Sequence, residues 1–245
     1  MSDTTPPSTA AEQDSLRAPN RLASMYFDIR ERVIGAAVMM DDDQLATRVP
    51  ACPDWTVQGL VAHLVSMPMA IVAGEIPEAV MGGGDPNPWL AQLVADNQHR
   101  TIPDLARWWA SADDALAATL AGAGLLLADL FTHEADLHGA IGSTAHRNTP
   151  ELGSQIDAAM AGLQKGITAA GLPPIAVDNG TERRVSAEGT PGWTLRTGFW
   201  EAHRVFNSRR TPEELLDIPH DGDPSIYFDV MHEHLPFPAA SLGER

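Results

Sequence analysis

The chain has 245 residues, and its formal net charge of −17 corresponds to a pI near 4.7. A surface this acidic repels phosphate groups, which argues against nucleic acid and anionic membranes as partners. The single cysteine, Cys52, excludes an intrachain disulfide framework and a CxxC zinc or redox site. Hydrophobic residues make up 44% of the chain, but no uninterrupted apolar stretch is long enough to span a bilayer. We therefore expect a cytoplasmic globular protein, and the polar residues 1–15 do not resemble a secretory signal.

The first half of the chain predicts helices. Residues 1–19, rich in Ser, Thr, Pro and Asp, are expected to form a disordered tail. Apolar residues then recur at three- and four-residue steps over 21–40, which predicts an amphipathic helix. The acidic run 41–43 ends this helix and is expected to be a solvated loop. A second helix is predicted over 56–74, capped by its first threonine and bent at its internal proline. Residues 81–88 are expected to form a loop.

The remaining elements predict a mainly α protein with a small α+β end. Residues 20–170 are expected to form an up-and-down helical bundle, and residues 171–245 a small α+β C-terminal domain. Two short segments on either side of an Asp-Asn-Gly-Thr turn predict a hairpin in the second part. The predicted elements are helices over 101–120, 124–142 and 149–171, hairpin strands at 175–177 and 182–187, a helix over 193–206, and short helices that begin at 211 and 223.

The predicted helix over 124–142 carries the residues best suited to hold a metal. At 100° per residue, Asp129, His133 and Asp136 share one side of it, whereas Glu134 and His138 share the opposite flank. Either pair of a carboxylate and an imidazole four residues apart can bind one metal ion. The zincin motif HExxH is not matched, because the second histidine comes one residue late and lies roughly 140° around the helix from the first. The residue pattern does not decide between the pair Asp129 and His133 and the pair Glu134 and His138.

A third ligand has to come from another helix. His63, at the edge of the apolar stripe of the second predicted helix, is the leading candidate, although a hydrogen-bonded place in the core explains it as well. Cys52 has no basic cluster near it in the sequence and is interpreted as a buried apolar residue, and Trp55 as a core anchor. His232 and His234 are two residues apart on a predicted helix and face different ways, so they are not treated as ligands.

Three segments resemble one known family. Residues 50–64, PACPDWTVQGLVAHL, resemble the hallmark VPxCPxWTVxxLVAHL of the mycothiol-dependent maleylpyruvate isomerase family, which belongs to the DinB-like superfamily. A second family element, an acidic residue followed by x3-His-x2-Asp, is matched by Asp129, His133 and Asp136, although many relatives carry Glu in the first place. Residues 201–214 resemble the C-terminal RxxxGRR segment, with Ser208 in place of the glycine. The resemblance covers nearly all of the chain after residue 19.

The resemblance implies a DinB-like four-helix bundle with a divalent metal, usually zinc, at its centre. The implied ligands are His63, Asp129 and His133, so the alternative pair, Glu134 and His138, is not expected to bind the metal. Two imidazoles and one carboxylate leave coordination positions open, as in catalytic rather than structural zinc sites. Asp136 is expected to orient His133 or a bound water, although an ordinary solvated helix residue is an equal alternative.

The implied cofactor is mycothiol. An open zinc site can bind a low-molecular-weight thiol as its thiolate. A thiolate that adds to an activated double bond, allows rotation and leaves again isomerises a cis alkene, and the same sulfur can instead be transferred to an electrophile. Arg204 and Arg209, with Arg210 beside them, are candidates to bind the carboxylates of an anionic substrate, although charge balance with nearby glutamates also explains them.

The expected protein is thus a mycothiol-dependent isomerase or S-transferase. Its expected partners are a small-molecule substrate and the thiol, with no nucleic acid and no membrane, and its expected state is a monomer or homodimer. Two alternatives stay open. The same two histidines and one carboxylate match a non-haem iron(II) enzyme, and a helical bundle of this kind can also serve as a non-catalytic binding module.

Overall fold

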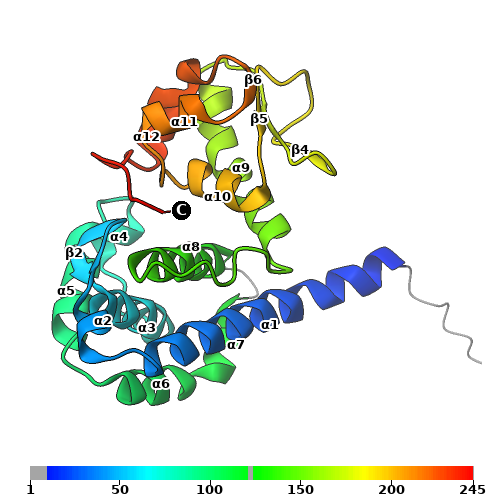
Figure 1. The fold of residues 1–245 in the computed structure, drawn as a ribbon. Helices are drawn as coiled ribbons and strands as arrows, with labels where there is room; N and C mark the ends of the chain where they lie inside the picture. Colours follow the sequence, from blue (N-terminus) through cyan, green and yellow to red (C-terminus); the bar gives the residue numbers. More distant parts are fainter. Residues whose placement is uncertain (1–9, 121–123, 245) are drawn as a thin grey trace, which may run out of the picture. The chain divides into compact units, whose positions relative to one another are not determined.

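The structure, a computed structural model, describes residues 10–120 and 124–244 (Figure 1). It is mainly helical with a small sheet region, as the sequence predicts at that level. The chain divides into two compact units. The first comprises the residues up to Arg48 together with Asp54–Glu134, and the second comprises Val49–Pro53 together with the residues from Ala135 onward.

The first unit begins with a helix longer than predicted. Helix α1 spans Ala10–Val38, so it starts well before the expected position 21, where Ala, Glu and Gln favour helix. Residues 1–9 of the expected tail lie outside the described residues. The acidic run expected to be a loop instead opens helix α2, Asp42–Ala46. Asp41 accepts a hydrogen bond from the backbone N–H of Gln44, and the Gln44 side chain accepts one from the Asp41 N–H, which is a complete capping box.

Helix α3, Val57–Ala73, forms the centre of the first unit. It follows two short paired strands, β1 (Arg48–Val49) and β2 (Cys52–Thr56). It begins and ends where the sequence predicts, because the Thr56 side chain accepts from the Gly59 N–H and Gly74 adopts a left-handed φ of 74°. Most of its residues are buried, and it packs against α1, α2, α5, α6 and α7.

The helices after α3 differ from the prediction in two places. A helix, α5, occupies much of the region between the predicted loop and the next predicted helix, and the helix predicted over 101–120 is divided at residues 111–112. Inside the core, Trp109 Nε1 donates a 3.1 Å hydrogen bond to the Tyr26 hydroxyl and so joins α6 to α1. The bounds are α4 Glu78–Met81, α5 Asn87–Asn97, α6 Ile102–Ala110, α7 Asp113–Leu120 and α8 Gly124–Ala140.

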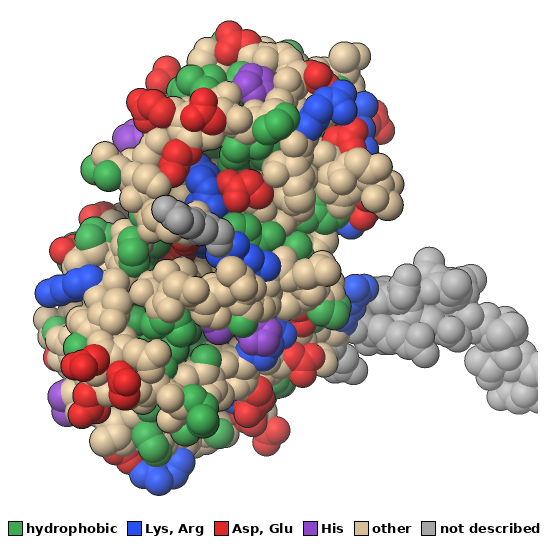
Figure 2. Space-filling model, in the orientation of Figure 1, with side chains coloured by type: hydrophobic (Ala, Val, Ile, Leu, Met, Phe, Trp, Pro, Cys, Tyr) green, Lys and Arg blue, Asp and Glu red, His purple; other side chains and the backbone are tan. Residues whose placement is uncertain are grey.

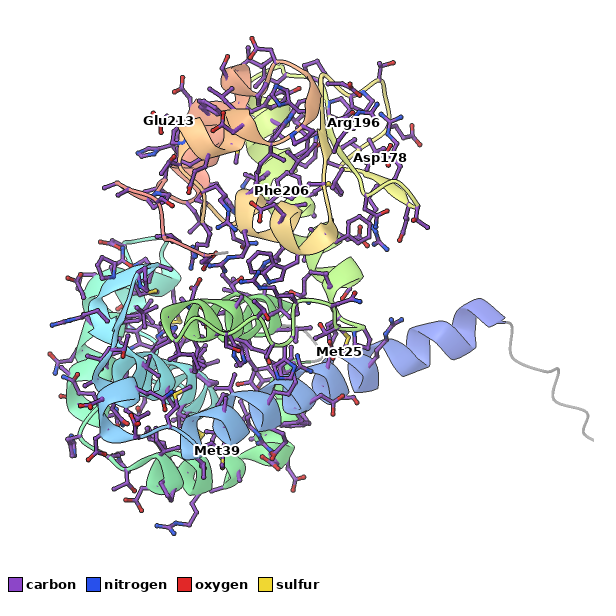
Figure 3. The ribbon with its side chains drawn as sticks, in the orientation of Figure 1. Met25, Met39, Asp178, Arg196, Phe206 and Glu213 are labelled. Carbon is purple, nitrogen blue, oxygen red and sulfur yellow. The ribbon has the colours of Figure 1, made fainter. Side chains whose placement is uncertain are left out.

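The second unit is built on a four-stranded sheet of order β4-β3-β5-β6. The predicted hairpin is present as β3 and β4, which pair antiparallel, while β5 runs parallel to β3 and antiparallel to β6. Across β3 and β5, Arg196 Nη1 lies 3.7 Å from Asp178 Oδ2 (Figure 3). The bounds are α9 Leu152–Ala169, β3 Ile175–Asp178, β4 Arg183–Val185, β5 Trp193–Arg196, α10 Phe199–Phe206, α11 Pro212–Asp217, β6 His220–Gly222, η1 Pro224–Tyr227 and α12 Phe228–His234.

Two elements of the second unit differ from the prediction. The segment 193–206, predicted as one helix, is strand β5 followed by helix α10, because Trp193 and Leu195 are buried in a strand that pairs on both sides. Helix α9, predicted as part of the bundle, contributes Ile156 and Met160 to the core of this unit instead. There they pack with residues such as Phe206 of α10 (Figure 3).

The surface carries the charge expected from the composition. Figure 2 shows acidic side chains distributed over the visible face. Among the described residues, no single helix is long and apolar enough to cross a membrane. In the same part of the chain, one pair of helices, α7 and α8, passes the test of length and composition when taken together, and the two are bent by 110° relative to each other.

Candidate metal centre

The three predicted ligands come together inside the first unit. His63 lies on α3, and Asp129 and His133 lie one turn apart on α8. One potential ligand atom from each residue lies within 4.8 Å of the others. Asp129 is placed between the two imidazoles, with 3.4 Å from its Oδ2 to His63 Nε2 and 3.5 Å from its Oδ1 to His133 Nε2. The ring centroids of the two histidines are 5.2 Å apart, and the ring planes are nearly perpendicular.

The burial of these residues leaves the centre accessible from one side. The His63 side chain is 1% exposed, His133 is 12% exposed and Asp129 is 21% exposed. Solvent therefore reaches the group past the carboxylate, whereas the His63 imidazole lies at its closed end. A deep imidazole with an open approach beside it is the arrangement that a catalytic metal requires, because the ion must keep coordination positions for other ligands.

The His63 imidazole shows that these residues fit a metal ion. Both of its ring nitrogens are buried, and neither has a hydrogen-bond partner in the part of the chain that the structure describes. The 3.4 Å approach to Asp129 lacks the geometry of a hydrogen bond. An imidazole without hydrogen bonds in the protein interior costs free energy. A divalent cation bound by the facing nitrogen and the carboxylate would remove much of that cost, and two imidazoles with one carboxylate suit zinc or iron(II).

Trp55 covers the His63 ring. Their centroids are 4.7 Å apart and their planes are inclined by 29°, so the two rings are stacked. The indole also approaches His133, at 6.3 Å between centroids. Sequence reasoning identified Trp55 as a core anchor and missed this contact. Its signals in the sequence are its place directly before the Thr56 cap and its position within the family-like segment 50–64.

The carboxylate of the alternative pair on α8, that of Glu134, has another partner. Glu134 is buried and receives two hydrogen bonds from Arg32 of α1, 2.7 Å from Nε to Oε1 and 2.9 Å from an Nη to Oε2. A bidentate guanidinium–carboxylate pair of this kind satisfies both oxygens and neutralises the charge. Glu134 is therefore engaged by an arginine, whereas Asp129 faces two imidazoles.

The remaining predicted site residues gather in the second unit. Asp136 Oδ1 accepts hydrogen bonds from Arg204 (2.7 Å) and from Arg209 Nε (3.2 Å), and its Oδ2 accepts from Arg209 Nη2 (2.8 Å). The Arg204 and Asp136 side chains are 0% exposed, whereas Arg209 is 12% exposed. Arg204 is thus completely buried and pairs with two carboxylates, those of Asp136 and Glu244.

The charges in this group are fixed by their surroundings. Burial lowers the pKa of the Arg209 guanidinium. The negative charge and the hydrogen bonds of Asp136 have a larger and opposite effect, so the pKa of Arg209 lies above its ordinary value. His203, on α10, is fully buried next to Arg204 and Arg209. Desolvation and the two positive charges lower the pKa of His203 to about 3, against an ordinary value of 6.5. His203 is therefore neutral in the folded protein at neutral pH.

The protein is mainly helical, and two histidines and a carboxylate, His63, His133 and Asp129, lie close enough together to hold one divalent ion. Residues 27–126 match the family model described as the mycothiol maleylpyruvate isomerase N-terminal domain, so the resemblance seen in the sequence is confirmed over this stretch. The matched stretch contains Trp55 and His63 and ends just before Asp129. No curated protein and no solved structure matches the chain.

Proposed function

We propose that this chain is a zinc-dependent enzyme with mycothiol as its thiol cofactor, and that it isomerises or S-modifies a small, electrophilic, anionic substrate. The observation that carries the proposal is the convergence of His63, Asp129 and His133 in the unit that holds the family match. The proposal includes a DinB-like four-helix bundle as the arrangement around this centre, and a cytoplasmic monomer or homodimer.

The chain's own residues would hold the ion with neutral nitrogen donors from His63 and His133 and with one oxygen of Asp129. A divalent ion bound there supplies positive charge that favours the thiolate form of a thiol cofactor, which is the nucleophile for addition to an activated double bond. The single carboxylate leaves part of the cation's charge uncompensated. Arg32 holds Glu134 in a bidentate pair, so this second carboxylate of α8 does not compete for the ion.

The second unit is proposed to contribute to substrate binding through Arg209. This guanidinium keeps 12% of its side chain exposed, and its orientation is fixed by hydrogen bonds to Asp136 and to the Asn207 carbonyl. A partly exposed, pre-oriented arginine suits a carboxylate ligand. Asp136 and Arg204 are proposed as the buried support that holds it.

Elemental analysis of protein purified without added metal tests the metal centre. We expect one zinc per chain in the wild type and its loss in His63→Ala. His99→Ala removes an exposed histidine of the same unit and serves as the matched control, in which zinc should be retained. Stoichiometric iron would support the non-haem iron alternative. A folded, metal-free wild type would overturn the proposal and favour a non-catalytic binding module.

The reaction is tested by incubating the metal-loaded protein with mycothiol and a panel of electrophiles that includes maleylpyruvate. Isomerisation returns the thiol after each turnover, whereas S-transfer consumes one thiol per product. A count of free thiol against product therefore separates the two activities. Turnover that does not depend on the thiol would overturn the thiol-dependent mechanism even if the metal is present.

A further inference from the structure

A largely buried array of alternating charges lies in the second unit. In the described part of this unit, three arginines and three carboxylates follow one another, and each arginine–carboxylate neighbour pair is joined by an ion pair. The arginines come from α10 or from the residues just after it. The order along the array is Arg209, Asp136, Arg204, Glu244, Arg210 and Glu201.

Glu244 is the one member of this array that comes neither from a helix nor from the few residues that follow α10 in the sequence. It belongs to the 238–244 segment, which follows α12 and contains neither helix nor strand (Figure 1). Within the described chain, no backbone–backbone hydrogen bond holds this segment. Ser241 donates a side-chain hydrogen bond to Glu214, and Ser241 and Gly243 are exposed. The Glu244 side chain is only 3% exposed, so it enters the protein as a single side chain.

Glu244 is held as an arginine site holds a ligand carboxylate. Arg204 donates from Nε to Oε2 at 2.9 Å and from Nη2 to Oε1, and Arg210 donates from Nη1 to Oε2 at 2.8 Å. A bidentate fork with a second guanidinium is a strong and specific way to bind a carboxylate. Both guanidinium groups also lie beside the Trp200 ring, at 5.9 and 5.6 Å from its centroid, which adds favourable cation–π contact.

Two further features show that this position is built to receive a group. Arg204 Nη1 is buried and has no hydrogen-bond partner among the described residues, so Glu244 leaves one donor of the site unused. Gly139 of α8 makes room for the glutamate, because a Cβ there would lie 2.8 Å from Glu244 Oε1. Glycine inside a helix costs about 1 kcal/mol relative to alanine, and the space for this carboxylate explains its presence.

We propose that Arg204 and Arg210 form a carboxylate-binding site that the chain's own Glu244 fills, and that a small-molecule carboxylate takes its place when the 238–244 segment moves away. The segment thereby competes with carboxylate ligands for this site. The proposal is independent of the metal centre, since all the residues named belong to the second unit.

The test uses variants of the full chain that empty or fill the site. Glu244→Ala leaves a space of carboxylate size beside the two arginines, whereas Glu244→Gln fills the same space with a neutral group. The melting temperature of each is measured in acetate and in chloride at equal ionic strength. We expect acetate to raise the Tm of Glu244→Ala by roughly 2–4 °C or more, and to leave the wild type and Glu244→Gln unchanged.

A control separates this site from general effects of acetate. Asp221→Ala removes the carboxylate that pairs with the exposed Arg196, at 2.5 Å, in the same unit. It should show no acetate-specific shift. An equal Tm of Glu244→Ala in acetate and chloride, or a shift of the same size in Asp221→Ala, would overturn the proposal. If Glu244→Ala does not fold in chloride, its recovery in acetate supports the site, and failure in both salts counts against it.

Gly139→Ala gives a second test with every charge retained. The added methyl group meets Glu244 Oε1 and should push the side chain out of the site. We expect acetate to raise the Tm of this variant and to leave that of the wild type unchanged. An equal Tm of Gly139→Ala in acetate and chloride would show that the site does not exchange its occupant.

Discussion

The indole of Trp55 lies stacked on the imidazole of His63, with 4.7 Å between the ring centroids and 29° between their planes. Thr56 places the indole there, because it caps α3 directly after Trp55. The face of the deepest histidine is thereby covered, and the freedom of the ring to rotate is reduced. Trp55 thus acts as a positioning residue for the proposed metal centre, since it touches the histidine and offers the ion no ligand atom.

Replacement of Trp55 should weaken metal binding without abolishing it. An aromatic contact contributes about 0.5–1.5 kcal/mol, so we expect Trp55→Ala to raise the dissociation constant for zinc about two- to tenfold. Trp55→Phe keeps an aromatic face on His63 and should stay close to the wild type. Calorimetric titration of zinc into the metal-free protein measures both. The same loss in both variants would show that stacking is not what orients the ring.

The indole also provides an optical readout of the centre. Co²⁺ bound close to Trp55 should quench part of the tryptophan fluorescence, and this part should disappear in Trp55→Phe. Trp108→Phe removes a half-buried tryptophan of the same unit that lies against Arg100, so it should leave the metal-dependent quenching unchanged. Equal quenching in the wild type and Trp55→Phe would place the ion elsewhere.

The carboxylate ligand and its neighbour on α8 should respond differently to neutralisation. Asp129→Asn keeps the size of the side chain and removes its charge, so we expect zinc affinity to fall at least about tenfold. Glu134→Gln should keep the metal and lose stability, because it leaves Arg32 with a weakened partner. Asp54→Asn alters an exposed carboxylate of the same unit and serves as control. Metal lost from Glu134→Gln and retained in Asp129→Asn would show that the carboxylate ligand is Glu134 rather than Asp129.

The parts of the fold that local chemistry determines were predictable from the sequence. The bounds of α3 follow from a capping threonine and a terminal glycine, and the Asp129–His133 pair follows from a spacing of one helical turn. The pairing of His63 with them joins residues far apart in the sequence, so periodicity could not supply it. Its place at the edge of an apolar stripe made His63 a candidate, and only the resemblance to a family assigned it as a ligand together with Asp129 and His133.

The errors lie where distant partners decide the local structure. Residues 193–196 form a strand because β3 and β6 pair with them from both sides, and that pairing leaves no local periodic signal in four residues. The insertion of Glu244 between two arginines depends on a segment without regular structure and on the space at Gly139. The residues around Glu244 in the sequence indicate neither its contacts with the two arginines nor the space at Gly139.

The N-cap of α3 should contribute measurably to stability. The Thr56 hydroxyl accepts from the Gly59 N–H at 3.2 Å, so it satisfies a donor that the helix leaves open. Thr56→Ala should lower the free energy of unfolding by about 1 kcal/mol, as measured by urea denaturation, whereas Thr56→Ser keeps the acceptor and should lose much less. Similar losses in both variants would assign the effect to the threonine methyl group rather than to the cap.

His203 should make the protein sensitive to acid. In the folded protein, burial and the charges of Arg204 and Arg209 lower its pKa to about 3, whereas an exposed histidine titrates near 6.5. Between about pH 6.5 and pH 3, the unfolded chain therefore binds a proton at this residue that the folded protein does not. Stability is lost as pH falls through this range, with a limiting slope of about 1.4 kcal/mol per pH unit for one proton.

The variant His203→Gln removes this group and should flatten the pH dependence. We compare the free energy of unfolding in urea at pH 7.5 and pH 4.5, and expect the wild type to lose more stability on acidification than His203→Gln. His232→Gln removes an exposed histidine of the same unit and serves as the matched control, in which the loss should stay close to that of the wild type. An equal loss in the wild type and His203→Gln would mean that His203 is protonated in the folded protein, so that the arginines beside it do not keep it neutral.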